Sequence, residues 1–197
     1  ICKITPMNYL PPIEYTHNAK TAANASVIWL HGLGANGDDF APVAKALALP
    51  DVRFILPHAP LQPVSINNGY VMPAWYDLFG LNLGSHEDAA GIEQSAQYLN
   101  GLIEKEIALG VPANRIVIAG FSQGGALALY AALRYPKRLA GVLALSTYVP
   151  LKSRLLQDAH PSNTQTQIMM AHGEYDEIIS LATAQVSLQL LKDAHYP

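Results

Sequence analysis

Residues 115–125 read Arg115-Ile116-Val117-Ile118-Ala119-Gly120-Phe121-Ser122-Gln123-Gly124-Gly125. The first five are the most strand-like run in the chain, and the alanine-rich stretch from Gly125 to Arg134 is typical of a helix. Between them lies a Gly-x-Ser-x-Gly pattern, which fits a sharp strand-to-helix turn that lifts a serine clear of a sheet. The junction therefore predicts an α/β fold and makes Ser122 a candidate catalytic nucleophile.

The two flanking glycines have a steric explanation. A side chain at Gly120 or Gly124 would collide with the neighbouring strand or helix, and the free N–H groups of the helix N-terminus would face the reaction centre. A five-residue match also occurs by chance, and its alternative interpretation is an ordinary glycine-rich turn. The strand before it and the helix after it favour the catalytic interpretation.

The rest of the chain alternates short β-branched runs with longer segments of helical period. This order is typical of a mostly parallel sheet with helices on both faces. The other expected strands are Ser26–Leu30, Val52–Leu56, Ala140–Leu145 and Gln167–Ala171. The other expected helices are residues 38–49, a long helix that follows the capping-box spacing of Ser85 to Asp88 and ends at Gly110, and Leu181–Leu191.

The length of 197 residues and the hydrophobic content of 50% fit a single domain, residues 1–197. One connection, residues 57–85, carries several prolines and aromatic side chains. It is too long and irregular for a plain turn. We expect this segment to act as a lid or substrate loop.

Composition argues against several classes of function. A net charge of −3 without a basic stripe disfavours nucleic-acid binding, and no apolar run approaches the roughly 20 residues of a membrane span. Metal-site spacing and phosphate-gripping glycine loops are also missing, so we expect neither metal nor cofactor. Cys2 has no partner for a disulfide, which fits the cytoplasm. An exposed apolar lid could pair two subunits into a homodimer.

An acyl-transfer serine also needs hydrogen-bond donors for the oxyanion. In this fold one donor is the backbone N–H after the nucleophile, here Gln123, and the other comes from the loop after an early strand. His31-Gly32-Leu33-Gly34 follows residues 26–30 directly, and Leu33 is the expected second donor. The alternative for this loop is a simple turn.

The acid of a catalytic triad should follow a later strand, because catalytic groups collect at the carboxyl ends of the strands in open α/β sheets. Residues 167–171 are followed by His172-Gly173-Glu174-Tyr175-Asp176-Glu177. We favour Asp176 as the acid, with Glu174 and Glu177 as rivals and a solvated acidic loop as the alternative. His172 is expected to satisfy a local hydrogen bond.

The general base is harder to assign. The fold orders its triad serine, acid, histidine, and His195 is the only histidine after Asp176. A helix and a further strand should separate the acid from the base, so His195 comes too early and is expected in a loop or at a strand entry. Any earlier histidine would require an unusual triad order.

Several spaced motifs resemble one known family. They are Trp29-Leu30-His31-Gly32-Leu33-Gly34, Gly120-Phe121-Ser122-Gln123-Gly124-Gly125 and His172-Gly173-Glu174-Tyr175-Asp176, supported by Pro73-Ala74-Trp75-Tyr76-Asp77 and Gly141-Val142-Leu143-Ala144-Leu145-Ser146. From about Ala25 to Lys192, the chain resembles the bacterial carboxylesterase and acyl-protein thioesterase family of α/β-hydrolases.

The resemblance implies a cofactor-free serine hydrolase. Such an enzyme cleaves carboxylic esters or thioesters of acyl chains through an acyl-enzyme on Ser122, which water then releases. The family's oxyanion donors and acid map onto the three residues proposed above for those roles. The resemblance also implies an apolar acyl-binding groove, although its two aromatic residues could equally pack the lid; the groove residues are Met72, Trp75, Tyr76 and Leu78.

The resemblance breaks at the C-terminus. A strand, a loop with the triad histidine and a closing helix should follow residues 192–197, so we expect a truncated form of a working enzyme. The alternative is a catalytically silent hydrolase-fold protein that lacks the base and binds acyl lipids or a partner.

Overall fold

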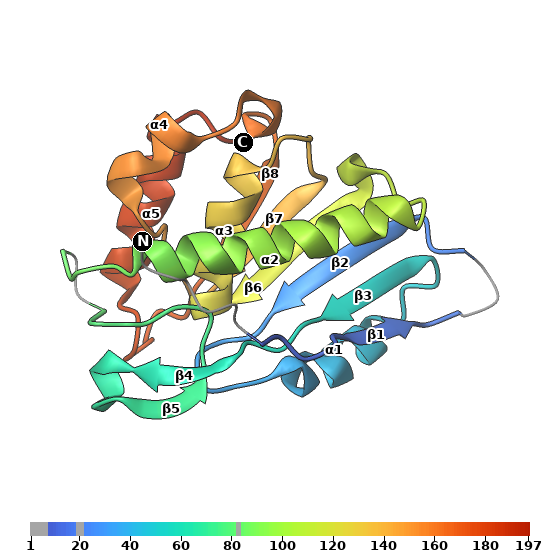
Figure 1. Cartoon of the computed structure of the whole chain (residues 1–197). Helices are drawn as coiled ribbons and strands as arrows, with labels where there is room; N and C mark the ends of the chain where they lie inside the picture. Colours follow the sequence, from blue (N-terminus) through green and yellow to red (C-terminus); the bar gives the residue numbers. More distant parts are fainter. Residues whose placement is uncertain (1–7, 19–21, 82–83) are drawn as a thin grey trace, which may run out of the picture.

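A six-stranded sheet forms the centre of the computed structural model, which describes residues 8–18, 22–81 and 84–197 (Figure 1). All neighbouring strands are parallel except the first, which pairs antiparallel at one edge. Cys2, on which the expected redox setting depends, lies outside the described residues. In spatial order the strands are β1 (Ile13–Thr16), β3 (Val52–Leu56), β2 (Ala25–Leu30), β6 (Ile116–Phe121), β7 (Gly141–Leu145) and β8 (Gln167–Ala171).

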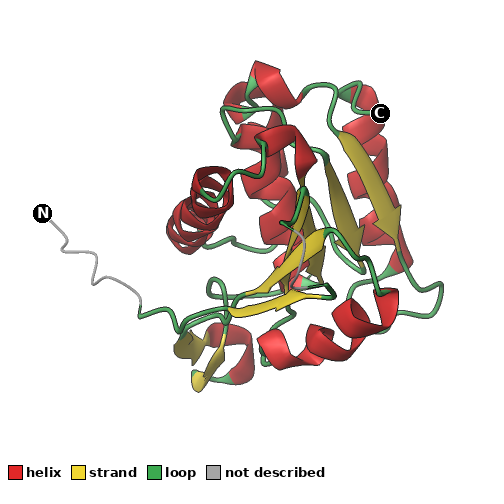
Figure 2. Ribbon diagram, turned by 90° about the vertical axis from the view of Figure 1, so that its right-hand side faces the viewer, coloured by secondary structure: helices red, strands yellow, loops and turns green. Residues whose placement is uncertain are grey.

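Helices cover both faces of this sheet, as the alternation of apolar segments predicts (Figures 1 and 2). The helices are α1 (Ala41–Leu47), α2 (Ala89–Ala108), α3 (Gln123–Arg134), α4 (Leu155–Asp158) and α5 (Leu181–Asp193), with short 3₁₀ turns η1 (Gly37–Phe40), η2 (Ser65–Asn67), η3 (Ala113–Arg115), η4 (Lys152–Arg154) and η5 (Pro161–Asn163).

Strand β2 illustrates how the two faces are filled. Successive side chains of a strand point to opposite faces. Ile28 and Leu30 accordingly join the core formed with α2 and α3, whereas Trp29 joins the smaller core that includes Ala44 of α1. In the described part of the chain, no helix combines the length and the apolar character needed to cross a membrane.

Two expectations about helices require correction. The expected helix over residues 38–49 is divided into η1 and α1, and it ends where Ala48 adopts a left-handed φ of 49°. The long helix begins later than the capping-box spacing predicts, because an isolated bridge between Leu78 and Glu87 keeps that backbone extended. Asp88 is the N-cap instead, and its side chain accepts a hydrogen bond from the Gly91 N–H at 2.9 Å.

The connection over residues 57–85 is less irregular than its sequence indicates. It contains an antiparallel hairpin of β4 (Leu61–Val64) and β5 (Tyr70–Pro73), which lies outside the main sheet (Figure 1). Several apolar side chains of this hairpin are exposed, among them Leu61, Tyr70 and Val71. The lid role remains a prediction.

The register of the sheet brings four loops to one edge. Leu30 pairs with Gly120, Phe121 pairs with Leu145, and Leu145 pairs with Ala171, so four parallel strands end nearly level. The segments that begin at residues 31, 122, 146 and 172 therefore leave the sheet side by side. Every residue that the sequence nominates for the chemistry lies on one of these segments.

Candidate active site

Ser122 occupies the sharp turn between β6 and α3. Its φ of 53° and ψ of −120° are unfavourable for a residue with a side chain, and such strain persists only where the surroundings hold it. The Ser122 N–H donates to the Leu145 carbonyl at 2.9 Å, and the Ser122 carbonyl accepts from the Ala126 N–H at 3.1 Å and the Thr147 hydroxyl at 2.7 Å. The turn predicted by the Gly-x-Ser-x-Gly pattern is therefore present and firmly held.

The glycines around Ser122 are required by close backbone approach. A Cβ atom at Gly124 would lie 2.5 Å from the carbonyl oxygens of both Leu30 and His31, at the end of β2. A Cβ atom at Gly120 would overlap the backbone of Gly124. The serine turn and the loop after β2 can meet only because these positions carry no side chain.

The geometry of two backbone N–H groups suits an oxyanion site. Gln123 is the first residue of α3, so its N–H has no partner within the helix. After Gly32, the N–H of Gly34 donates to the Pro73 carbonyl at 2.8 Å and that of Ala35 to the Gly32 carbonyl at 3.2 Å. Within the described structure, Leu33 thus carries the N–H of this loop that stays available to a substrate.

Ser122 opens into a cavity of about 740 Å³ that is large enough for an acyl chain. Leu33 and Gln123 line it beside the serine. Most of the remaining lining is apolar or aromatic and comes from Phe40, Ile66, Leu78, Leu81, Phe121, Tyr148, Ile178 and Ile179.

The expected groove residues are only partly on this lining. Leu78 lines the cavity. Trp75 and Tyr76 are 0% and 2% exposed and belong to the core, which agrees with the alternative that these aromatic residues pack internally. Met72 packs half-buried against the same core and is not part of the lining either. Tyr76 lines a smaller neighbouring cavity, and a substrate-binding role for these three residues stays a prediction.

Tyr148, which lines the cavity, is hydrogen-bonded to the buried Tyr76. The hydroxyl groups of Tyr76 and Tyr148 lie 3.1 Å apart, and burial raises the pKa of both phenols, so both stay neutral. Tyr148, Leu78 and Leu81 also line a second cavity of about 90 Å³. These three side chains form the wall that the two cavities share.

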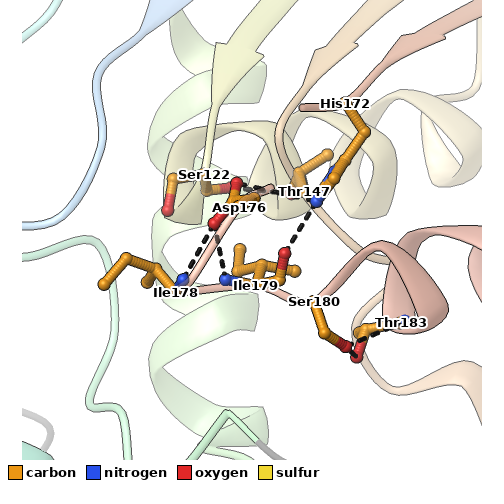
Figure 3. Close-up of polar contacts among 8 residues, drawn as sticks. All are labelled: Ser122, Thr147, His172, Asp176, Ile178, Ile179, Ser180 and Thr183. Atoms are coloured by element: carbon orange, nitrogen blue, oxygen red, sulfur yellow. Dashed lines mark hydrogen bonds and ion pairs between the residues drawn. The ribbon is translucent and has the colours of Figure 1, made fainter. Parts of the chain in front are cut away.

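Asp176 is held by its own loop (Figure 3). One carboxylate oxygen accepts from the N–H groups of Ile178 and Ile179, both at 2.9 Å, and the other lies 3.6 Å from His172 Nε2. Ile178 and Ile179 themselves line the Ser122 cavity. The rivals Glu174 and Glu177 are exposed, so Asp176 is the carboxylate of this loop that is fixed beside the cavity.

Comparison with known proteins identifies the chain. A model of the phospholipase/carboxylesterase family matches residues 12–196. The chain belongs to this family. As a phospholipase/carboxylesterase-family protein with the α/β-hydrolase fold, it is a serine hydrolase of carboxylic esters or thioesters.

Two fungal proteins are similar to this chain over most of its length. Acyl-protein thioesterase 1 of Neurospora crassa is 43% identical over 183 residues, which are 87% of this chain and 75% of that protein. Acyl-protein thioesterase 1 of Yarrowia lipolytica is 44% identical over 174 residues, or 86% and 77% of the two chains. These sequence relatives are fungal, so they do not bear on the bacterial part of the resemblance.

Solved structures of this phospholipase/carboxylesterase fold include two plant proteins. Arabidopsis thaliana SOBER1 superposes with a TM-score of 0.84 at 33% identity, covering 88% of this chain and 85% of that one. Zea mays acyl-protein thioesterase 2 superposes with a TM-score of 0.81 at 28% identity, covering 93% and 87%.

The histidines of this family member lie as the sequence predicts. His172 donates from Nε2 to the Ile179 carbonyl at 2.7 Å, which is the expected local hydrogen bond. His195 adopts a φ of 61° in the turn after α5. In the described part of the chain, the hydrogen bonds of Ser122 go to Leu145, Ala126 and Thr147, and none goes to a histidine.

Sequence reasoning missed several cavity residues of the phospholipase/carboxylesterase fold. Tyr148 lies three positions beyond β7, and Ile178 and Ile179 lie two and three positions after Asp176. A sequence signal for both segments was available, because each follows the carboxyl end of a parallel strand on the same side of the serine strand, β7 next to β6 and β8 next to β7. Phe40 and Ile66 gave no such signal, since they reach the cavity through tertiary packing alone.

Proposed function

We propose that this protein hydrolyses thioesters and esters of long acyl chains, with Ser122 as the nucleophile. Leu33 and Gln123 donate backbone N–H groups to the oxyanion, and Asp176 is the acid of the triad. The observation that carries the proposal is the position of Ser122, which is held at positive φ and lines a large, mainly apolar cavity together with Leu33 and Gln123.

The chemistry follows from this arrangement. A general base takes the Ser122 hydroxyl proton as Oγ attacks the carbonyl carbon, and the carbonyl oxygen becomes an oxyanion between the two N–H donors. Collapse of this intermediate breaks the bond to the leaving group, which takes the proton from the base and departs as a thiol or alcohol. The acyl-enzyme that remains is hydrolysed by water through the same steps, with the water proton passing to Ser122 Oγ. Asp176 has one oxygen bound by two N–H groups, so the other is the oxygen that can orient an imidazole base.

The acyl preference is argued from the cavity. Apolar side chains dominate its lining, and each buried methylene of a substrate contributes about 0.8 kcal/mol. The names of the fungal relatives, acyl-protein thioesterase 1, support thioesters of acylated proteins as the natural substrates.

A chain-length series tests the proposal. With the complete gene product, we expect kcat/KM for p-nitrophenyl esters and acyl thioesters to rise about fourfold per added methylene until the cavity is filled. Ser122→Ala protein gives the background rate. Absence of turnover on every substrate, together with acyl-lipid binding, would support the silent binding protein instead.

We further propose a cytoplasmic enzyme that needs no metal or cofactor and binds no nucleic acid. Pairing of two subunits through exposed side chains of the β4–β5 hairpin, such as Leu61 and Tyr70, also stays a prediction. Sedimentation of the complete protein measures that pairing directly.

A further inference from the structure

Trp75 is hydrogen-bonded to three separate segments of the chain, two of which belong to the site. Its backbone N–H donates to Gln123 Oε1 at 2.9 Å, and its indole Nε1–H donates to the His31 carbonyl at 2.8 Å. Its own carbonyl accepts from the Ser95 hydroxyl of α2. Trp75, His31 and Ser95 are all fully buried, so these bonds are shielded from water.

The side chain of Gln123 completes this connection. It is 3% exposed, and besides accepting from Trp75 it donates from Nε2 to the Tyr76 carbonyl at 2.7 Å. The amide thus bonds to the backbone of two consecutive residues, at the N–H of Trp75 and the carbonyl of Tyr76. These two hydrogen bonds fix the rotamer of the Gln123 side chain.

These bonds link the two proposed oxyanion donors. One donor is the N–H of Gln123, and the other is the N–H of Leu33, two residues after His31. A short path of hydrogen bonds runs from the Gln123 side chain to Trp75 and from the Trp75 indole to the His31 carbonyl. The donors are far apart in sequence, so their separation in space depends on contacts of this kind.

We propose that Trp75 and the Gln123 side chain are positioning residues that set the spacing of the two oxyanion N–H groups. This inference rests on the proposed function. Neither side chain touches the substrate: Trp75 does not line the cavity, and the Gln123 amide is occupied by residues 75 and 76. Both act by holding the backbone donors.

The expected effect is on the transition state. An oxyanion donor must lie within about 2.7–3.1 Å of the developing charge, and misplacement by about 1 Å can cost 100-fold in rate. Because the oxyanion forms only in the transition state, a change in donor spacing lowers kcat and leaves KM nearly unchanged. A loss of general stability would instead lower the amount of active enzyme.

Gln123→Met tests the inference, because methionine has a similar length and can make neither of the two hydrogen bonds of the Gln123 amide. The matched control is Gln62→Met: Gln62 Nε2 donates to the Ala74 carbonyl at 2.6 Å, so it grips the same segment but reaches neither donor and lines neither described cavity. Trp75→Phe is the second test variant, since it keeps an aromatic ring and removes the indole N–H.

For each complete protein, kcat and KM are measured on a short-chain ester, with active sites counted by fluorophosphonate titration. A trifluoromethyl ketone provides a second readout, because Ser122 Oγ adds to its carbonyl carbon and the carbonyl oxygen becomes the oxyanion. We expect Gln123→Met and Trp75→Phe to lower kcat by about 10- to 100-fold and to weaken the ketone in parallel, with KM within about threefold. Gln62→Met should match the wild type.

The possible outcomes separate the two claims. Inactive wild-type protein would overturn the proposed function itself. Active wild type with unchanged kcat and ketone affinity in the test variants would overturn the positioning role alone, and so would an equal loss in Gln62→Met. If Gln123→Met does not fold, as judged by thermal melting, the comparison of Trp75→Phe with Gln62→Met decides.

Discussion

His31 shows how a single buried side chain shapes the oxyanion loop. Its Nδ1 lies 2.7 Å from the Gly32 carbonyl, and its Nε2 accepts from the Ala59 N–H at 3.0 Å. Only a neutral ring with the proton on Nδ1 satisfies both partners. Burial lowers the pKa of this imidazole, so folding favours the neutral ring over the protonated one.

This shift makes part of the stability depend on pH. The pKa of His31 is about 6.5 in the unfolded chain and lower in the folded protein, so between the two values the unfolded chain binds more protons. The contribution is therefore complete above about pH 6.5 and is lost as the pH falls toward the folded pKa. Urea unfolding of wild type and His31→Gln at about pH 7.5 and about pH 5.5 measures it.

We expect the free energy of unfolding to fall less with acid in His31→Gln than in the wild type. Other groups titrate in both proteins, so the difference between the two slopes isolates His31. Equal slopes would contradict the neutral, buried assignment.

At the scale of elements, the serine turn makes a close backbone contact with the end of β2. An Ala side chain at Gly124 would press against the Leu30 and His31 carbonyls, and backbone atoms cannot move aside cheaply. We expect Gly124→Ala to lower the free energy of unfolding by about 1–3 kcal/mol and to reduce hydrolysis, as measured by urea unfolding and ester turnover.

Gly101 supplies a control with the opposite sign. It lies on the exposed side of α2, where an added Cβ meets nothing within 4 Å. Gly101→Ala should therefore raise the free energy of unfolding by about 0.5–1 kcal/mol, since alanine favours the helix. Destabilisation by both substitutions would show that the effect at Gly124 is not one of local crowding.

A helix or strand can be predicted from the sequence where local residues determine it, and not where a contact with a distant segment does. The pattern around Ser122 specifies a strand, a turn and a helix within a few residues, so its local chemistry suffices. The start of α2 depends on a bridge between Leu78 and Glu87, which no local pattern encodes. Strand β1 was not predicted, because its four residues gain their structure by pairing with β3.

For the whole molecule, the cavity is the feature that sequence specifies least. Leu33, Ser122 and Gln123 line it, and the loop of Asp176 reaches it, because parallel strands bring their carboxyl ends together. Trp75 and Tyr76 match a family motif but lie in the core, because burial depends on how residues 57–85 fold back. Motifs thus specify the reacting groups, and tertiary packing decides which side chains a substrate meets.

The cavity predicts a selective effect of filling it. Leu78→Trp adds bulk to the wall shared by the two cavities, so long acyl chains should lose more than short ones. We expect kcat/KM for palmitoyl esters to fall by about 10-fold or more, while that for butanoyl esters stays within about threefold.

Leu156→Trp is the control for this change, because Leu156 lies on α4 with 72% of its surface exposed and lines neither cavity. It should leave both rates unchanged. Equal losses on short and long esters in Leu78→Trp would contradict an acyl-binding role of the cavity.

The central claim is that Ser122 is the nucleophile, and covalent labelling tests it most directly. The complete protein is treated with a fluorophosphonate and digested, and the modified peptide is identified by mass spectrometry. The account predicts rapid labelling at Ser122 alone and neither labelling nor hydrolysis in Ser122→Ala. Labelling at another residue, or hydrolysis at the wild-type rate by Ser122→Ala, would contradict it.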